Sequence, residues 1–212
     1  MEEYVILVDK NDNPVGREEK VRCHLPNGKL HRAFTVLLFD KKARLLLTKR
    51  SKSKMLWPDD WDGTVASHPR ESESYVSSAE RRLPEELGVS SKLDYLFKFE
   101  YHVPYKDIGS ENEICGTLIG ILDSFSSIKL VKDEISETVW VTSAELIQNL
   151  KKTPHLYCPW MLIALYLLSS SDKQMLNKHQ TILSAWTKSD IKDALEASTV
   201  FHLPDKNWRL VN

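Results

Sequence analysis

The chain has 212 residues, and its 29 Lys and Arg residues nearly balance its 30 Asp and Glu residues. This length suits one domain with a sizeable core, and the small net charge argues against a nucleic-acid-binding surface, which is normally basic. Cys23, Cys115 and Cys158 lack metal-knuckle spacing, so we expect no disulfide framework. The N-terminal sequence does not resemble a signal peptide, and the longest apolar run, Trp160 to Leu168, is too short for a membrane span. We therefore expect a cytoplasmic protein.

Short apolar runs separated by turn residues predict strands along most of the chain. In the first quarter these runs are Tyr4 to Val8, Val15 to Val21 (which carries Lys20), Ala33 to Phe39 and Arg44 to Lys49. Later runs are Leu93 to His102, Glu113 to Leu122 and Thr138 to Val141. Because strands outnumber helices and hairpin signals recur, the pattern favours an α+β fold.

Helical spacing predicts the remaining elements. Arg81 to Val89 is typical of the end of an amphipathic helix, with Leu83 and Leu87 on one face and Gly88 at the stop. The segment 142–145 is a capping box that begins a helix through Leu150. A second helix begins at Pro159 and continues to Leu168, since proline is accepted in a first helical turn.

The C-terminal region has weaker helical spacing, and Ser189-Asp190 is a candidate helix cap. Its apolar positions are Leu176, Ile182, Leu183, Trp186, Ile191 and Leu195. We expect a main domain over residues 1–169 and a helical C-terminal extension over residues 170–212 that packs on the same domain. A dimer contact or an active-site lid is the alternative role for this extension.

Three histidines and a pair of carboxylates are the first candidates for chemistry. His24 and His31 bracket a Pro-Asn-Gly turn, and His68 ends a loop. Glu111 and Glu113 lie two apart on a strand and therefore project from the same face. Together the five side chains can form an N/O site for zinc, manganese or magnesium. Taken singly, each is better explained as part of a solvated strand start or as an ordinary surface or core histidine.

Cations and aromatic residues form the second group of candidates. The cations are Lys20, Arg50, Lys54 and Arg82, and the aromatic residues are Tyr101, Trp57, Trp61 and Trp160. Arginine and lysine suit phosphate recognition, and aromatic faces stabilise cations. The plainer interpretations are a charged surface and a filled core.

Several short motifs, each weak alone, follow one another along the chain. They are Cys-His-Leu, Leu-His-Arg-Ala-Phe, Lys-Arg-Ser, Ser-His-Pro, Arg-Arg-Leu-Pro-Glu-Glu-Leu-Gly-Val, Glu-Asn-Glu-Ile-Cys and Pro-Trp-Met. In this order, from about Val5 to Leu168, the chain resembles the type I isopentenyl-diphosphate Δ-isomerases, a branch of the Nudix fold. The resemblance implies a Nudix-type α/β/α sandwich with a mixed sheet, and an enzyme that interconverts isopentenyl and dimethylallyl diphosphate.

The resemblance also implies a role for each candidate residue. His24, His31, His68, Glu111 and Glu113 would bind one divalent ion (Zn²⁺, Mn²⁺ or Mg²⁺), and Glu86 would bind a Mg²⁺ that bridges to the substrate diphosphate. Lys20, Arg50, Lys54 and Arg82 would bind the diphosphate oxygens. Glu113, beside Tyr101, would protonate the alkene, and Trp160 would shield the tertiary cation. The implied partner is a small prenyl diphosphate, bound by a monomer or a homodimer.

The Nudix box itself is degenerate. Ser67 stands where its glycine belongs, Glu73 is kept, and Arg82 replaces the first glutamate of Arg-Glu-x-x-Glu-Glu. Because a metal-binding carboxylate is lost, this pattern counts against Nudix hydrolysis and is typical of the isomerase branch.

A second departure concerns the proton-transfer groups. The family carries a cysteine two residues before the histidine of its His-Pro pair, and this position is Ala66 here. A methyl group exchanges no proton, and loss of a positioned acid or base typically costs about 10²–10⁴ in rate. Three explanations stay open: an engineered alanine that inactivates an ordinary isomerase, a divergent enzyme that protonates a prenyl diphosphate and ends in cyclisation or hydration, and a non-catalytic prenyl-diphosphate binder.

Overall fold

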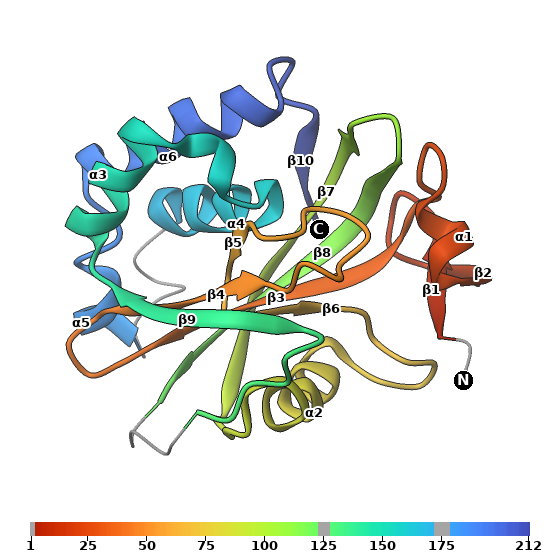
Figure 1. Ribbon diagram of the computed structural model, residues 1–212, viewed down its shortest axis with the longest axis horizontal. Helices are drawn as coiled ribbons and strands as arrows, with labels where there is room; N and C mark the ends of the chain where they lie inside the picture. Colours follow the sequence, from red (N-terminus) through yellow and green to blue (C-terminus); the bar gives the residue numbers. More distant parts are fainter. Residues whose placement is uncertain (1–2, 123–127, 172–178) are drawn as a thin grey trace.

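The structure is a computed structural model that describes residues 3–122, 128–171 and 179–212. Within these residues, ten strands form one sheet, with helices on both faces (Figure 1). The strands are β1 (Tyr4–Val8), β2 (Pro14–Glu19), β3 (His31–Phe39), β4 (Leu45–Arg50), β5 (Trp61–Asp62), β6 (Val65–Ser67), β7 (Leu93–Tyr105), β8 (Gly109–Ile121), β9 (Ile135–Val141) and β10 (Trp208–Val211). The helices are α1 (Lys20–His24), α2 (Tyr75–Leu87), α3 (Ser143–Lys152), η1 (Pro154–Leu156), α4 (Pro159–Ser170), α5 (Gln180–Leu183) and α6 (Ser189–His202).

Strand β3 lies at the centre of the sheet. It pairs in parallel with β8, in a register that runs from His31 opposite Glu113 to Phe39 opposite Ile121. It also pairs antiparallel with β1, β4 and β6, and the main path of the sheet is β10-β7-β8-β3-β1-β2. Both faces of a sheet with parallel central strands are covered, which explains why β3 is an almost continuous apolar run.

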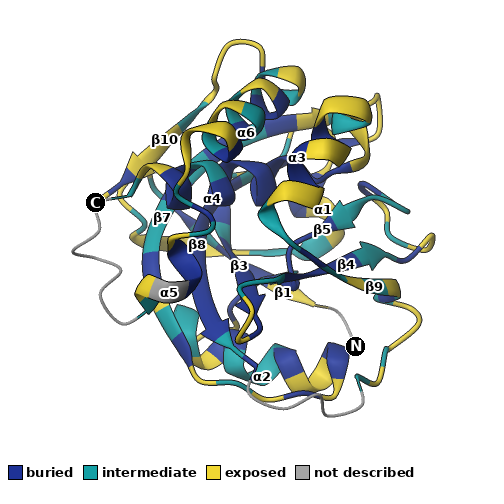
Figure 2. Ribbon diagram, turned by 90° about the vertical axis from the view of Figure 1, so that its left-hand side faces the viewer, coloured by how far each residue is buried: buried dark blue, intermediate teal, exposed yellow. Residues whose placement is uncertain are grey.

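Two apolar layers cover the two faces of the sheet. On one face, β3 residues such as Leu37 pack with residues of α3, α4 and α6. On the other face, Val36 and Leu38 pack with Leu83 and Leu87 of α2. Figure 2 shows this buried band running through the centre of the molecule between the exposed outer surfaces of the helices. The arrangement is an α/β/α sandwich, so the predicted α+β class is confirmed.

Local sequence signals explain where the main helices begin and end. Helix α2 begins at a capping box formed by Ser74 and Ser77, and it ends at Gly88, whose φ of 67° lies in the left-handed region that favours glycine. The predicted capping box of α3 and the predicted start of α4 at Pro159 are both confirmed. Nearly all of α4 is buried, as expected for a core helix.

Other sequence predictions were wrong in detail. The segment Val15 to Val21 does not form one strand, because the Glu19 carboxylate accepts hydrogen bonds from the N–H groups of Val21 and Arg22 and thereby starts a helix. Lys20 is therefore the first residue of α1. The short strands β5 and β6 were not predicted either, since two and three residues give no periodicity.

The C-terminal segment contains both helices and a strand. Strand β10 pairs antiparallel with β7, from Trp208 opposite Tyr101 to Val211 opposite Lys98, and was not predicted. Ser189 does not cap α6, whose N-cap is Lys188 without a side-chain hydrogen bond. Predicted apolar position Leu176 lies outside the described residues. In the described part of the chain, no helix has the length and apolar character needed to cross a membrane.

The contacts of α6 allow a test of how the extension is coupled to the rest of the domain. Leu195 is fully buried in the main core, whereas Phe201 of the same helix is 57% exposed. We expect Leu195→Ala to lower the free energy of unfolding by about 2–5 kcal/mol, because it leaves a cavity, and Phe201→Ala to change it by less than about 1 kcal/mol. Urea unfolding monitored by tryptophan fluorescence measures both. An early separate transition in Leu195→Ala would show instead that residues 170–212 unfold on their own.

Candidate active site

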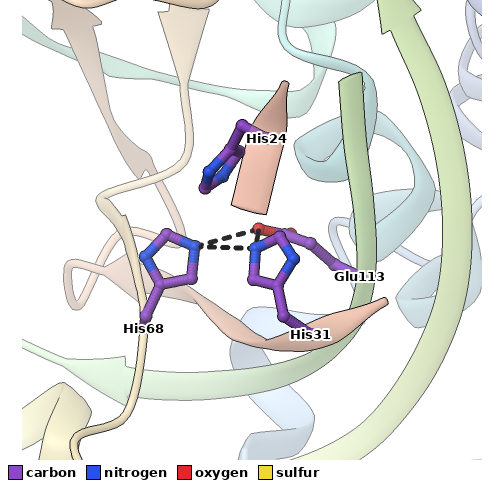
Figure 3. A group of neighbouring side chains, drawn as sticks. All are labelled: His24, His31, His68 and Glu113. Carbon is purple, nitrogen blue, oxygen red and sulfur yellow. Dashed lines mark hydrogen bonds and ion pairs between the residues drawn. The ribbon is translucent and has the colours of Figure 1, made fainter. Parts of the chain in front are cut away.

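Three imidazoles and one carboxylate meet at the end of the central strand pair (Figure 3). His31 begins β3 directly opposite Glu113 of β8, His24 ends α1, and His68 follows β6. The Nε2 atoms of His31 and His68 are 3.1 Å apart, and they lie 3.3 and 3.2 Å from Oε1 of Glu113. Each of the four residues offers a ligand atom, and these atoms lie within 4.8 Å of one another.

Backbone carbonyls orient two of the rings. Nδ1 of His24 lies 2.6 Å from the carbonyl oxygen of Lys20, and Nδ1 of His31 lies 2.8 Å from that of Lys29. A carbonyl oxygen only accepts, so each Nδ1 carries the hydrogen, and in the neutral ring the Nε2 lone pair faces the cluster. Glu111 joins from the same face of β8, with Oε2 3.0 Å from Nε2 of His24.

The charged groups of this buried cluster shift one another's pKa values. Burial opposes a charged ring, but the Glu111 carboxylate raises the pKa of His24, and contacts with Cys23 and Glu113 raise the pKa of His31 well above its usual value. Burial lowers the pKa of His68, and the positive charge of His31 lowers it further. The Glu111 and Glu113 carboxylates therefore favour the positively charged form of His24 and His31 in a site that excludes most water.

The donor set fits a divalent cation. Ligand atoms bound about 2.0–2.2 Å from one ion are themselves about 3–3.4 Å apart, and the Nε2 and Oε1 separations in this cluster have that size. Imidazole nitrogens with carboxylate oxygens suit zinc or manganese. Four of the five residues predicted as ligands thus lie together as one metal site requires, and the fifth, Glu111, contacts His24.

Glu113 is also in contact with a tyrosine. The Tyr101 hydroxyl donates to Oε2 of Glu113 over 2.6 Å, and the two residues are opposite each other in the β7–β8 register. Burial, together with the Glu113 charge, raises the pKa of Tyr101 well above its usual value, so the phenol stays protonated. Glu113 therefore has one oxygen toward the histidines and the other held by a hydrogen-bond donor.

A cavity of about 300 Å³ adjoins the cluster. The predicted site residues that line it are Lys20, His24, Arg50, Lys54, Ala66, His68, Arg82, Tyr101, Glu111, Glu113 and Trp160. His31 is fully buried and contacts two of these lining residues, His68 and Glu113. Ala66, on β6, and Glu113, on β8, belong to strands on either side of β3, so the alanine methyl and the carboxylate reach the cavity from different strands.

Each of the four predicted phosphate-binding cations contacts a carboxylate. Lys20 lies 2.9 Å from Glu3, and Arg50 lies 3.2 Å from Asp62. The remaining contacts are those of Lys54 with Glu134, and of Arg82 with Glu86 at 2.5 Å, Glu85 at 3.1 Å and Glu134 at 3.3 Å. The positive charge of the cavity is therefore balanced by the protein's own acids.

Glu86 lies one helical turn after Arg82 and is only 5% exposed. Burial raises the pKa of this carboxyl to about 6, although Arg82 opposes the shift. It is not part of the histidine cluster. It lies instead beside two of the cations, Arg82 and Lys54.

Two residues beside the cavity gave no signal in the sequence. Asp62 is buried, and its Oδ1 accepts from the Trp160 indole N–H over 2.8 Å while its Oδ2 pairs with Arg50. Arg50 also donates to the carbonyls of Leu56 and Trp57, so it holds the loop after β4 in place. Glu134 precedes β9. Both acids act through contacts distant in sequence, which spacing and composition do not reveal.

Comparison with known proteins places the chain in a family. Residues 29–161 match the NUDIX domain family. The isopentenyl-diphosphate Delta-isomerase of Haloarcula marismortui is 39% identical over 170 residues, covering 76% of this chain and 88% of that protein. The corresponding protein of Halobacterium salinarum is 40% identical over 166 residues, covering 76% and 78%. The chain belongs to the type I isopentenyl-diphosphate Δ-isomerase family.

The fold assignment has independent structural support. A crystal structure of a Deinococcus radiodurans protein superimposes with a TM-score of 0.57 at 22% identity, covering 70% of this chain and 89% of that one. Together with the NUDIX match, this confirms the Nudix-type sandwich predicted from the sequence.

Asp60, next to the Arg50 loop, offers a test of the electrostatics around the cavity. Burial raises the pKa of Asp60 from about 3.8 to about 6, with Asp62 acting in the same direction and Arg50 opposing. A carboxyl with a raised pKa favours folding while protonated, and this contribution is lost as the pH rises from about 4 to about 6.

We therefore expect Asp60→Asn to raise the free energy of unfolding at pH 7.5 by roughly 1 kcal/mol, after allowance for solvent screening, and to change it little at pH 4. Urea unfolding at the two pH values measures this difference. An equal effect at both values would mean that the carboxyl titrates normally.

Proposed function

We propose that this protein interconverts isopentenyl and dimethylallyl diphosphate by protonating and deprotonating the substrate. The observation that carries the proposal is the presence of a His/Glu cluster and a set of cations on one cavity. The family to which the chain belongs supports the same reaction, and relatives at 39–40% identity bear the isomerase name. A cavity of about 300 Å³ lies at the small end of ligand sites, which favours a five-carbon diphosphate over long prenyl chains.

Glu113 is the proposed proton donor. His24, His31, His68, Glu111 and Glu113 would hold a divalent ion, which when bound makes an attached carboxyl more acidic. A proton carried by the Glu113 carboxyl would pass to the alkene, and the Tyr101 hydroxyl, which donates to Oε2 over 2.6 Å, would stabilise the carboxylate that remains. A strong acid is needed because the alkene is unactivated.

The rest of the cavity would bind and shield the substrate. Lys20, Arg50, Lys54 and Arg82 would bind the diphosphate oxygens, and Glu86 would hold a Mg²⁺ that contacts the same group. Trp160 would offer its π face to the tertiary cation, and its indole N–H is already fixed by Asp62. Water has to be excluded at this stage, since it would capture the cation.

Ala66 leaves the removal of the second proton open. The family membership favours isomerisation over cyclisation, hydration or simple binding, and Arg82 at the Nudix box disfavours hydrolysis. Either the alanine has inactivated an ordinary isomerase, or another group on the cavity accepts the proton. That the protein acts in the cytoplasm as a monomer or homodimer stays a prediction.

Metal binding can be tested without turnover. We expect Mn²⁺ or Zn²⁺ to raise the melting temperature of chelator-treated protein, because an ion that binds only the folded state stabilises it by mass action. His31→Asn should abolish this shift, whereas His179→Asn, outside the cluster, should keep it. A shift of the same size in His31→Asn would contradict the proposed ligand set.

The reaction can be tested at its two proposed proton-transfer positions. We expect Ala66→Cys to raise the turnover of isopentenyl diphosphate to dimethylallyl diphosphate by about 10²–10⁴, because it supplies an acid–base group. Adding Glu113→Gln to that variant should remove the activity, whereas Glu137→Gln on the surface should not. Product formation followed by NMR in heavy water measures both. If Ala66→Cys gave no product, the assignment of this position would be wrong.

A further inference from the structure

The Glu134 carboxylate lies between two of the cations assigned to the diphosphate. One oxygen, Oε2, contacts Nζ of Lys54, and the other, Oε1, lies 3.3 Å from Nη2 of Arg82. The two cations come from separate elements, since Lys54 lies in the loop after β4 and Arg82 lies on α2. The two oxygens of Glu134 thus bridge Lys54 and Arg82, as two oxygens of one phosphoryl group would.

The backbone around Glu134 is fixed to the loop that carries Lys54. The N–H of Ser51 donates to the carbonyl of Glu134 over 3.0 Å, and the Ser53 hydroxyl donates to the carbonyl of Asp133 over 3.1 Å. The Glu134 N–H donates to Val131 over 2.9 Å, which closes the turn before β9. The backbone of Glu134 is therefore fixed next to the loop that carries Lys54, which keeps the carboxylate within reach of this cation.

The charge of Glu134 is permanent in the working pH range. Burial opposes ionisation, but Lys54 and Arg82 lower the pKa of Glu134 to about 2, and Lys20 acts in the same direction. Lys54 and Glu134 are each about one-quarter exposed, so water screens their attraction only in part. An incoming diphosphate meets cations that are already paired, with a fixed negative charge between them.

We propose that Glu134 is the resident counter-anion of the diphosphate site: it occupies Lys54 and Arg82 in the free protein, and the substrate's diphosphate takes these contacts over. The proposal rests on the proposed function of the same cavity. A consequence is selectivity, because a singly or doubly charged anion has less to gain from displacing the carboxylate than a diphosphate with Mg²⁺ does. Glu134 would in this way lower the affinity for inorganic phosphate more than that for pyrophosphate.

Binding of inorganic anions tests the proposal without turnover. We expect Glu134→Gln to bind pyrophosphate, in the presence of Mg²⁺, about tenfold more tightly than the wild type, since the ion pairs of the carboxylate with Lys54 and Arg82 no longer have to be broken. The affinity for orthophosphate should rise by a larger factor than that for pyrophosphate. Isothermal titration calorimetry measures both affinities. Glu134→Ala is a second variant with the same expectation, for use if the glutamine variant does not fold.

Glu85→Gln is the matched control. Glu85 also contacts Arg82, over 3.1 Å, but its other partner is Arg81, at 2.9 Å, and its side chain is 37% exposed. The affinity of the Glu85→Gln variant for pyrophosphate should stay within about twofold of that of the wild type. Unchanged or weaker binding by a folded Glu134 variant would overturn the counter-anion proposal while leaving the proposed function standing. Failure of every protein to bind pyrophosphate would overturn both.

Discussion

The parallel pairing of β3 with β8, in the register that sets His31 opposite Glu113, is the interaction on which the site depends. Side chains alternate between the two faces of a strand, so a slip of one residue would turn Glu113 away from His31. Apolar residues along both strands, packed on opposite faces of the sheet, fix this register. The chemistry therefore rests on ordinary core packing a few residues further along the same strands.

Around this strand pair the molecule collects charges that are unfavourable in a protein interior. Glu113 and Glu111 are buried and ionisable, and each is compensated by an imidazole, while the nearby cations are each compensated by an acid. Burying charged groups costs free energy that pairing only partly returns. Binding of a metal ion and a multiply charged substrate would give these buried charges further partners and offset part of this cost. The same reasoning explains why acids with no evident catalytic role, such as Asp62 and Glu134, lie beside the cavity.

Much of the fold could be predicted from local patterns. Strand β1, the capping box of α3 and the glycine stop after α2 each follow from a few consecutive residues, and each is confirmed. Predictions failed where a distant contact or a short element decides the structure. Strand β10 forms because residues Trp208 to Val211 pair with the edge of β7, which is distant in sequence. Helix α1 begins where it does because the Glu19 side chain caps it. Candidate ligands were found by residue type and family resemblance, because spacing alone does not bring His24 and Glu113 together.

Ala66 affects the proposed conversion of the substrate but not the proposed binding of the ion and the diphosphate. The residues proposed to bind the ion and the diphosphate are all present, whereas the proposed removal of the second proton needs a group that Ala66 does not supply. The decisive measurement is therefore the location of the ion. Crystals grown with Mn²⁺ and measured at the manganese absorption edge should show an anomalous peak between the Nε2 atoms of His24, His31 and His68 and the Glu113 carboxylate. If crystals at saturating Mn²⁺ showed no anomalous peak there, or a peak only at other positions, the proposal that Glu113 is a metal-assisted proton donor would be contradicted.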